Sequence, residues 1–157
     1  MDLLRMLPLL SGWRWDAKDM DSPTIILPGG QLEVCRLIDK GWVWGASVSF
    51  SSEKPEFDIT YDEYLRTSST AEAAYGLGLT APNATGFFCS KYDAGPPPIY
   101  AMSLMPVNPM PFNKKLVGVI KNPTALPIVM YQYAHLLVVI YNEDEFRKSI
   151  KKVLGVD

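Results

Sequence analysis

The sequence predicts a mainly β protein, an antiparallel β-sandwich or jelly roll with a short helical insertion and a C-terminal α-helix. The stretch Leu126–Tyr141 carries no formal charge, and its 16 residues are fewer than the roughly 20 that a helix needs to cross a bilayer. Its Val, Ile and Tyr content suits a strand better than a helix. In Trp42–Phe50, large apolar side chains alternate with small or polar ones, which is typical of a half-buried strand. Eight of the 13 prolines lie between Pro96 and Pro127, where they mark strand ends and loops.

The chain opens with an apolar segment over residues 1–22. Asp2 stands where a secretory signal carries positive charge, and no small-residue cleavage site follows directly, so we do not expect a signal peptide. We expect an apolar arm that packs on the body of the protein or on a neighbouring subunit; lying on a membrane surface is the alternative. The interface residues of this arm would be Leu3, Leu4, Leu7, Trp13 and Trp15.

Residues 23–141 are expected to form the sandwich. Asp39-Lys40-Gly41 makes a tight reversal between two strand patterns, which predicts a hairpin. Residues 62–78 lose the period of two, and the Ala-Glu-Ala-Ala run within them favours short helical turns. The expected strands are 24–27, 31–38, 42–50, 56–61, 87–92, 99–105, 115–120 and 126–141. In the third of these, one face holds five residues that we expect in the core: Trp42, Trp44, Ala46, Val48 and Phe50.

A helix is predicted over residues 142–155. Asn142 is a good N-cap, Glu145 stands at the capping-box position, and Gly155 is a plausible stop. An apolar stripe recurs at helical spacing, through Phe146, Ile150, Val153 and Leu154. We expect this helix to pack on or beside the sandwich and to cover the long strand 126–141, which is apolar on both faces.

Composition and residue counts argue against several functions. The net charge is −2 and no basic block lies outside the last helix, which argues against broad electrostatic capture of nucleic acid. His135 is the single histidine, and Cys89, His135 and Asp93 form the only trio that could supply a nucleophile and a base. A lone histidine within a strand is more often structural. No cysteine pair has metal-ligand spacing and no phosphate-binding glycine loop is present, so no cofactor is predicted. Whether Cys35 and Cys89 pair is left open.

Two binding alternatives rest on residue type. Carboxylates gather at Glu56, Asp58, Asp62 and Glu63, and such a group could hold a catalytic metal ion in a hydrolase or nuclease. The simpler interpretation is a solvated strand face whose charge discourages edge aggregation. Exposed aromatic rings could stack on sugars, and the candidates for this role are Trp13, Trp15, Tyr92 and Tyr100.

The second half resembles small β-sandwich proteins of viruses and bacteriophages. The resemblance is carried by Pro106–Phe112, by Lys115–Thr124 and by the long strand that ends at Tyr141, with a weaker match over Gly29–Val34. These features are those of sandwich strands and loops, and no catalytic motif comes with them. The resemblance implies a virion, tail or surface-assembly role.

We therefore expect a non-enzymatic structural or binding protein that self-associates, with copies of itself or other assembly proteins as its partners. A carbohydrate-binding module and a metal-dependent hydrolase or nuclease are the alternatives. No transmembrane segment is predicted, and the virion or the host cytoplasm is the expected location.

Overall fold

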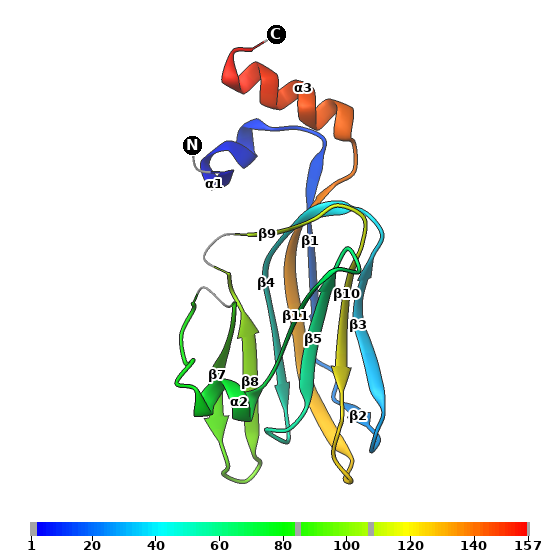
Figure 1. The fold of residues 1–157 in the computed structure, drawn as a ribbon, viewed down its shortest axis with the longest axis vertical. Helices are drawn as coiled ribbons and strands as arrows, with labels where there is room; N and C mark the ends of the chain where they lie inside the picture. Colours follow the sequence, from blue (N-terminus) through cyan, green and yellow to red (C-terminus); the bar gives the residue numbers. More distant parts are fainter. Residues whose placement is uncertain (1–2, 84–85, 107–108, 157) are drawn as a thin grey trace.

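The computed structural model describes residues 3–83, 86–106 and 109–156, with only the backbone for residues 3 and 4. Two antiparallel sheets pack face to face, as predicted from the sequence (Figure 1). Sheet A contains, in spatial order, β1 (Trp13–Met20), β11 (Ile128–Ile140), β4 (Lys40–Phe50), β8 (Ile99–Leu104) and β7 (Phe87–Asp93). Two short strands join it, β2 (Thr24–Ile26) on β11 and β9 (Met110–Phe112) on β4. Sheet B contains β3 (Gln31–Leu37), β10 (Leu116–Lys121), β5 (Glu56–Tyr61) and β6 (Leu65–Thr70).

One apolar core lies between the two sheets. Phe57 of β5 is fully buried, and its ring lies 5.3 Å from that of Phe87 in β7 and 6.1 Å from that of Tyr133 in β11. Residues from both sheets therefore meet around this one ring, as expected for a sandwich in which alternate side chains of each strand turn inward.

The long apolar segment forms the 13-residue strand β11, paired with β1 on one side and β4 on the other. This confirms the prediction of a strand over 126–141. On the outer face of β11, Val138 is fully buried, whereas Leu136 is 41% exposed. The second face of the strand is thus only partly covered.

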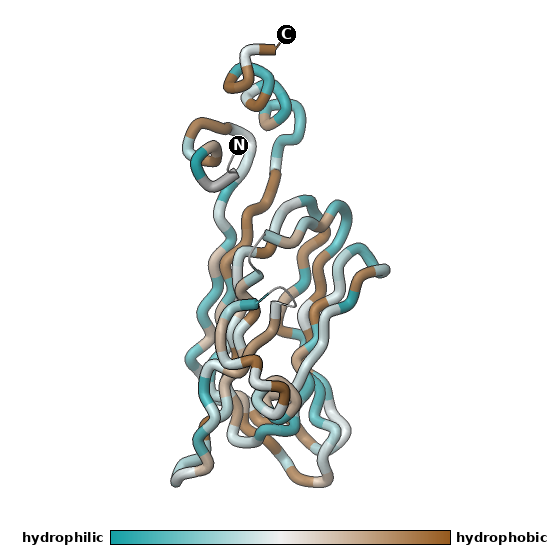
Figure 2. The backbone as a smooth tube through the Cα atoms, turned by 60° about the vertical axis from the view of Figure 1, so that its left-hand side comes forward, coloured by the Kyte–Doolittle hydropathy of each residue, from teal (hydrophilic) through white to brown (hydrophobic). Residues whose placement is uncertain are grey.

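Helix α3 (Glu143–Leu154) begins and ends as predicted, with Asn142 capping the amide of Glu145 and Gly155 in the left-handed conformation. It does not cover β11, however. The helix lies beyond one end of the sandwich, beside α1 (Leu3–Met6) and the 3₁₀ turn η1 (Leu7–Leu9) (Figures 1 and 2). Phe146 reaches back to Trp42, with ring centroids 5.9 Å apart. The cover predicted for the long strand is therefore limited to this end of the sheet.

The prediction that Trp42 and Trp44 belong to the core is wrong, because a β-bulge changes the phase of β4. The pairing of β4 with β11 shifts between Leu136 and Leu137, and Trp44 is left without a partner residue. Val43 therefore turns inward and is fully buried, while both tryptophans lie on the outer face of the sheet. Beyond the bulge the predicted core residues do turn inward: Ala46, Val48 and Phe50.

Residues 1–22 do not form one arm, because Trp13–Met20 is the edge strand β1. The segment before it folds back on α3 through Gly12, whose carbonyl oxygen accepts hydrogen bonds from the amides of Tyr141 and Asn142. Gly12 has a φ of +79°, and a Cβ there would lie 2.4 Å from the Asn142 carbonyl oxygen, so only glycine fits. The predicted interface residue Leu7 is buried within the chain, and the side chains of Leu3 and Leu4 lie outside the described residues.

The predicted helical insertion over 62–78 contains one short helix, α2 (Ala71–Gly76), which Thr70 caps. The preceding residues form strand β6 instead of helical turns. Across the described residues, no helix is long and apolar enough to span a membrane.

Candidate binding surface

All four tryptophans of the chain lie at one end of the outer face of sheet A. Trp13 and Trp15 point to this face because β1 pairs them with Ile140 and Val138, which also face outward. The Trp15 ring lies edge-on between two neighbours, 5.3 Å from the ring of Trp13 and 5.6 Å from that of Trp44. Strand pairing and the bulge in β4 thus bring together residues about 30 positions apart.

The members of this group differ in how they are held. The Trp13 indole N–H donates to the carbonyl oxygens of Leu7 and Leu10, at 3.0 and 2.9 Å, so this side chain anchors η1 to the sheet. Trp15 has no such bond within the described residues and is 45% exposed, and Leu136 and Met105 are exposed by 41% and 51%. We call Trp13, Trp15, Trp44, Met105 and Leu136 the tryptophan patch.

A groove of about 390 Å³ opens beside Trp44 on the same face. Its walls include the side chains of Trp44, Met105 and Leu136. Its floor is made by short side chains of three neighbouring strands: Ser47, Ser103 and Ala134. Among the residues that line it there is no Lys, Arg, Asp or Glu. We call this hollow the central groove.

The Trp44 indole nitrogen lies buried at the margin of the central groove and has no hydrogen-bond partner in the described part of the protein. Ser103, in contrast, is held by a 3.0 Å bond to Ser90. The central groove therefore combines the edge of the Trp44 ring with small hydroxyls and apolar walls. Such a surface is suited to contact with another apolar or aromatic side chain.

Behind this face, His135 belongs to a buried polar group that ties the edge strand to β11. Its Nε2 lies 3.0 Å from Asp16 of β1, and its Nδ1 lies 3.0 Å from the hydroxyl of Tyr133. Burial lowers the pKa of His135 and outweighs the opposing effect of Asp16. The neutral imidazole therefore donates from Nε2 to Asp16 and accepts at Nδ1 from Tyr133.

The trio of Cys89, His135 and Asp93 does not assemble, because two strands separate β11 from β7. The cysteine across the core from His135 is Cys35, whose pKa burial raises to about 11, which leaves it a neutral thiol. Both cysteines are free. Sequence reasoning missed Asp16, since the contact joins residues more than 100 positions apart.

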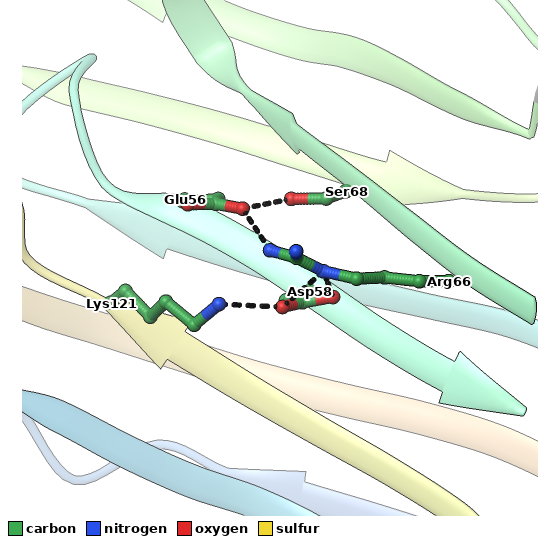
Figure 3. Close-up of polar contacts among 5 residues, drawn as sticks. All are labelled: Glu56, Asp58, Arg66, Ser68 and Lys121. Carbon is green, nitrogen blue, oxygen red and sulfur yellow. Dashed lines mark hydrogen bonds and ion pairs between the residues drawn. The ribbon is translucent and has the colours of Figure 1, made fainter. Parts of the chain in front are cut away.

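The carboxylates of β5 lie on the outer face of sheet B, where cations pair with them (Figure 3). The Arg66 Nε donates to both oxygens of Asp58, at 2.8 and 2.7 Å, and its Nη2 donates to Glu56 at 2.6 Å. Lys121 donates to Asp58 at 2.7 Å, and the Ser68 hydroxyl donates to Glu56. Burial raises the pKa of Asp58, but these bonds outweigh it and hold the pKa below its usual range.

The other two candidate metal ligands lie at the turn after β5. Asp62 accepts hydrogen bonds from the amides of Asn113, Lys114 and Lys115, and so fixes the loop before β10. Glu63 is an exposed partner of Lys115, 3.7 Å away. No group of three or more acidic, His or Cys side chains among the described residues is arranged to hold a metal ion. The four predicted ligands thus divide between an ion-pair network and a loop-capping contact.

The four candidate sugar-binding residues form two separate groups. Trp13 and Trp15 belong to the tryptophan patch, whereas Tyr92 and Tyr100 meet where α2 closes the edge of the sandwich, with centroids 4.9 Å apart. There the ring of Tyr92 stacks at 4.1 Å on Tyr75 of α2, a residue that the sequence did not single out. Tyr92 is thus stacked on Tyr75 and edge-on to Tyr100.

The sequence held one signal for the patch that was not recognised: Trp-x-Trp occurs twice, and a strand puts both members of such a pair on one face. A scan against protein-family models finds no model that matches the chain, and a search of curated proteins finds no match. The arguments for function therefore rest on the geometry.

Proposed function

We propose that this protein is a non-enzymatic structural protein that self-associates through the outer face of sheet A, as a component of a larger virion or surface assembly. The observation that carries the proposal is the tryptophan patch, in which Trp15 remains 45% exposed although its neighbours are apolar. Aromatic side chains at the centre of an uncharged patch are typical of the residues that supply most of the binding energy at protein interfaces.

The β1 edge of sheet A is a poorer candidate for association than the face of the sheet. On β1, Asp16 and Lys18 pair with the inward-facing residues Leu137 and His135, and so point toward the gap between the sheets. The Lys18 ammonium donates to the Val34 carbonyl oxygen of β3 at 3.0 Å. Inward-pointing charges on an edge strand oppose the addition of another strand. Association is therefore expected through side chains on the face.

A carbohydrate ligand is the second candidate, favoured by one observation. The exposed ring of Trp15 lies 5.6 Å from that of Trp44, and Trp44 lines the groove together with the hydroxyl-bearing Ser47 and Ser103. Aromatic rings beside hydroxyls are suited to sugar contact. Binding of a glycan at Trp15, with no self-association of the protein, would favour this second function.

Sedimentation equilibrium of three proteins tests the proposal: the natural chain, Trp15→Ser and the matched control Tyr64→Ser. Tyr64 is 89% exposed at the turn between β5 and β6, so its loss removes an exposed ring far from the patch. The natural chain and the control should self-associate alike, and Trp15→Ser should shift the equilibrium toward monomer. A natural chain that stays monomeric up to about 1 mM would contradict the proposal.

A further inference from the structure

We propose that helix α3 docks on an anionic phospholipid membrane, which it contacts through the exposed basic side chains of its last two turns and the apolar side chains beside them. This contact uses a different part of the molecule from the tryptophan patch and goes beyond the proposed self-association.

The first support is the separation of charge along α3. Its three carboxylates stand in the first turn, and four cations follow: Arg147, Lys148, Lys151 and Lys152. We call these four residues the basic face. No acidic side chain occurs from Phe146 to Val156, so the net charge of −2 consists of +4 in this segment and −6 in the rest of the chain. The end of an otherwise acidic protein is therefore complementary to an anionic surface.

The second support is that three of these cations have no partner of their own. Arg147 donates to the Glu143 carboxylate at 3.0 Å, whereas the side chains of Lys148, Lys151 and Lys152 make no hydrogen bond or ion pair among the described residues. All three lysines are exposed. The cations on the outer face of sheet B, in contrast, are bound by carboxylates of β5. The charge of the basic face is thus available to an external anion.

The third support is the orientation of the helix. Phe146 is buried and its ring lies 5.9 Å from that of Trp42, while the Ser149 hydroxyl accepts a 3.1 Å bond from the Ser11 amide. At 3.6 residues per turn, the three lysines lie about 120° to 160° around the helix axis from Phe146. They therefore point away from the side that the chain itself holds. Because α3 lies beyond the end of the sandwich, a flat surface can reach it before it meets either sheet (Figures 1 and 2).

The fourth support is the presence of exposed apolar side chains among the cations. Arg147, Lys151 and Leu154 recur at i, i+4 and i+7, so they share one stripe of the helix. Leu154 is 47% exposed, and Val156, just beyond the helix, is 54% exposed. In η1, which lies beside α3, Leu9 is 66% exposed. Helices that lie in the membrane interface combine basic and apolar side chains in this way, with the apolar groups entering the headgroup layer.

This combination favours a membrane over nucleic acid. A duplex would be held by the four cations alone, and the −6 carried by the rest of the chain would oppose a long polyanion. A membrane gains from the cations and from the apolar side chains, and it needs contact only at the end of the molecule.

Cosedimentation of the full chain with lipid vesicles tests the proposal, at about 0.15 M salt so that charges farther than about 8 Å are screened. One set of vesicles is phosphatidylcholine, and the other is an equal mixture of phosphatidylcholine and phosphatidylserine. The natural chain should bind the mixed vesicles reversibly and the neutral ones much more weakly. The triple variant Lys148→Gln/Lys151→Gln/Lys152→Gln should lower the partition coefficient by about 100-fold, since each basic residue contributes a factor of about five.

The matched control removes three exposed lysines from the sandwich: Lys54→Gln/Lys91→Gln/Lys114→Gln. It changes the net charge equally and should leave the partition coefficient within about twofold of that of the natural chain. Leu154→Ser/Val156→Ser keeps every charge and should weaken binding to the mixed vesicles severalfold. Circular dichroism checks the fold of all three variants.

The outcomes separate this inference from the proposed function. Without vesicles, the triple α3 variant should self-associate as the natural chain does, with an unchanged dissociation constant for the dimer, the simplest product of self-association. A natural chain that stays in the supernatant with the mixed vesicles, or that binds neutral vesicles equally well, would overturn membrane docking. So would a control variant that loses as much binding as the α3 variant, or binding to a DNA duplex that exceeds binding to the mixed vesicles. None of these results bears on self-association.

Discussion

The outer faces of the two sheets differ in the side chains that they carry and in the partners that those side chains have. On sheet B, carboxylates of β5 are bonded to cations from both neighbouring strands, as the pairs of Asp58 with Arg66 and with Lys121 show. On sheet A, the corresponding positions hold tryptophan, serine and alanine, and the lining of the central groove contains no Lys, Arg, Asp or Glu. The carboxylates on the face of sheet B therefore have cationic partners within the chain, whereas the face of sheet A leaves the apolar side chains of Trp15 and Leu136 partly exposed.

This difference assigns separate roles to the two faces. A network of alternating charges resists stacking against an apolar surface, because stacking would remove the charges from water. A patch of aromatic and small residues gains free energy when a partner covers it. Substitutions on sheet B should therefore change the stability of the monomer, and substitutions on sheet A should change association.

The largest effect on stability is expected from the double substitution Arg66→Gln with Lys121→Gln. It leaves the Asp58 carboxylate, 6% exposed, without its cationic partners. We expect the free energy of unfolding to fall by about 2 kcal/mol, which denaturant titration measures. The dissociation constant of the dimer should not change.

The matched control is Arg36→Gln, which breaks the exposed pair with Glu33 on the edge strand β3. An exposed pair of this kind contributes little, so the loss should be below about 1 kcal/mol. An equal loss in the two cases, or a change of oligomeric state in either, would remove the distinction between the faces.

A smaller effect on stability is expected from pH, and it falls in a different pH range for each of the two sheets. Because burial lowers the pKa of His135, the unfolded chain binds a proton more readily than the folded one. The contribution of His135 is therefore full above about pH 6.5 and is lost as the pH falls through the lowered folded pKa. The lowered pKa of Asp58 acts in the same direction but only in stronger acid, below about pH 4.

Denaturant titration of the natural chain and His135→Gln at pH 7.5 and at pH 5 measures this effect. The glutamine amide retains a donor for Asp16 and an acceptor for Tyr133 but does not titrate. The natural chain should lose stability between the two pH values and the variant should lose less. Equal losses would show that His135 is not the group that titrates.

The smallest effect is that of salt on association. Since the groove and its walls carry no formal charge, the dissociation constant of the dimer should change by less than about threefold between 0.05 and 0.5 M NaCl. A tenfold weakening would indicate that ion pairs, and hence a different surface, hold the dimer together.

The sequence predicted the elements whose pattern is local. The long strand β11 and the caps of α3 at Asn142 and Gly155 follow from composition and cap residues, and the structure has them. The predicted hairpin of 31–38 with 42–50 is wrong: both strands form, but the turn at Asp39 carries the chain from sheet B to sheet A, so β3 pairs with β10 and β4 pairs with β11 and β8. Strand β6 was missed because its sequence, Leu-Arg-Thr-Ser-Ser-Thr, is mostly polar and lies on the outer edge of sheet B.

What the sequence did not predict depends on long-range pairing. The outward position of Trp42 and Trp44 follows from one bulge opposite β11, and a bulge shifts the phase of every residue beyond it. The contact of His135 with Asp16 and the meeting of Trp15 with Trp44 likewise require strands far apart in the chain to become neighbours. The candidate surface is therefore a product of the topology.

Hydroxyl-radical footprinting at two protein concentrations tests the central claim most directly, because it reports both faces in one sample. Trp15 represents the outer face of sheet A, and Tyr64 represents the turn beside sheet B. As the concentration rises through the dissociation constant, the oxidation rate of Trp15 should fall severalfold while that of Tyr64 stays constant. An oligomer in which Trp15 is oxidised as fast as in the monomer, or in which Tyr64 is protected in its place, would contradict the account.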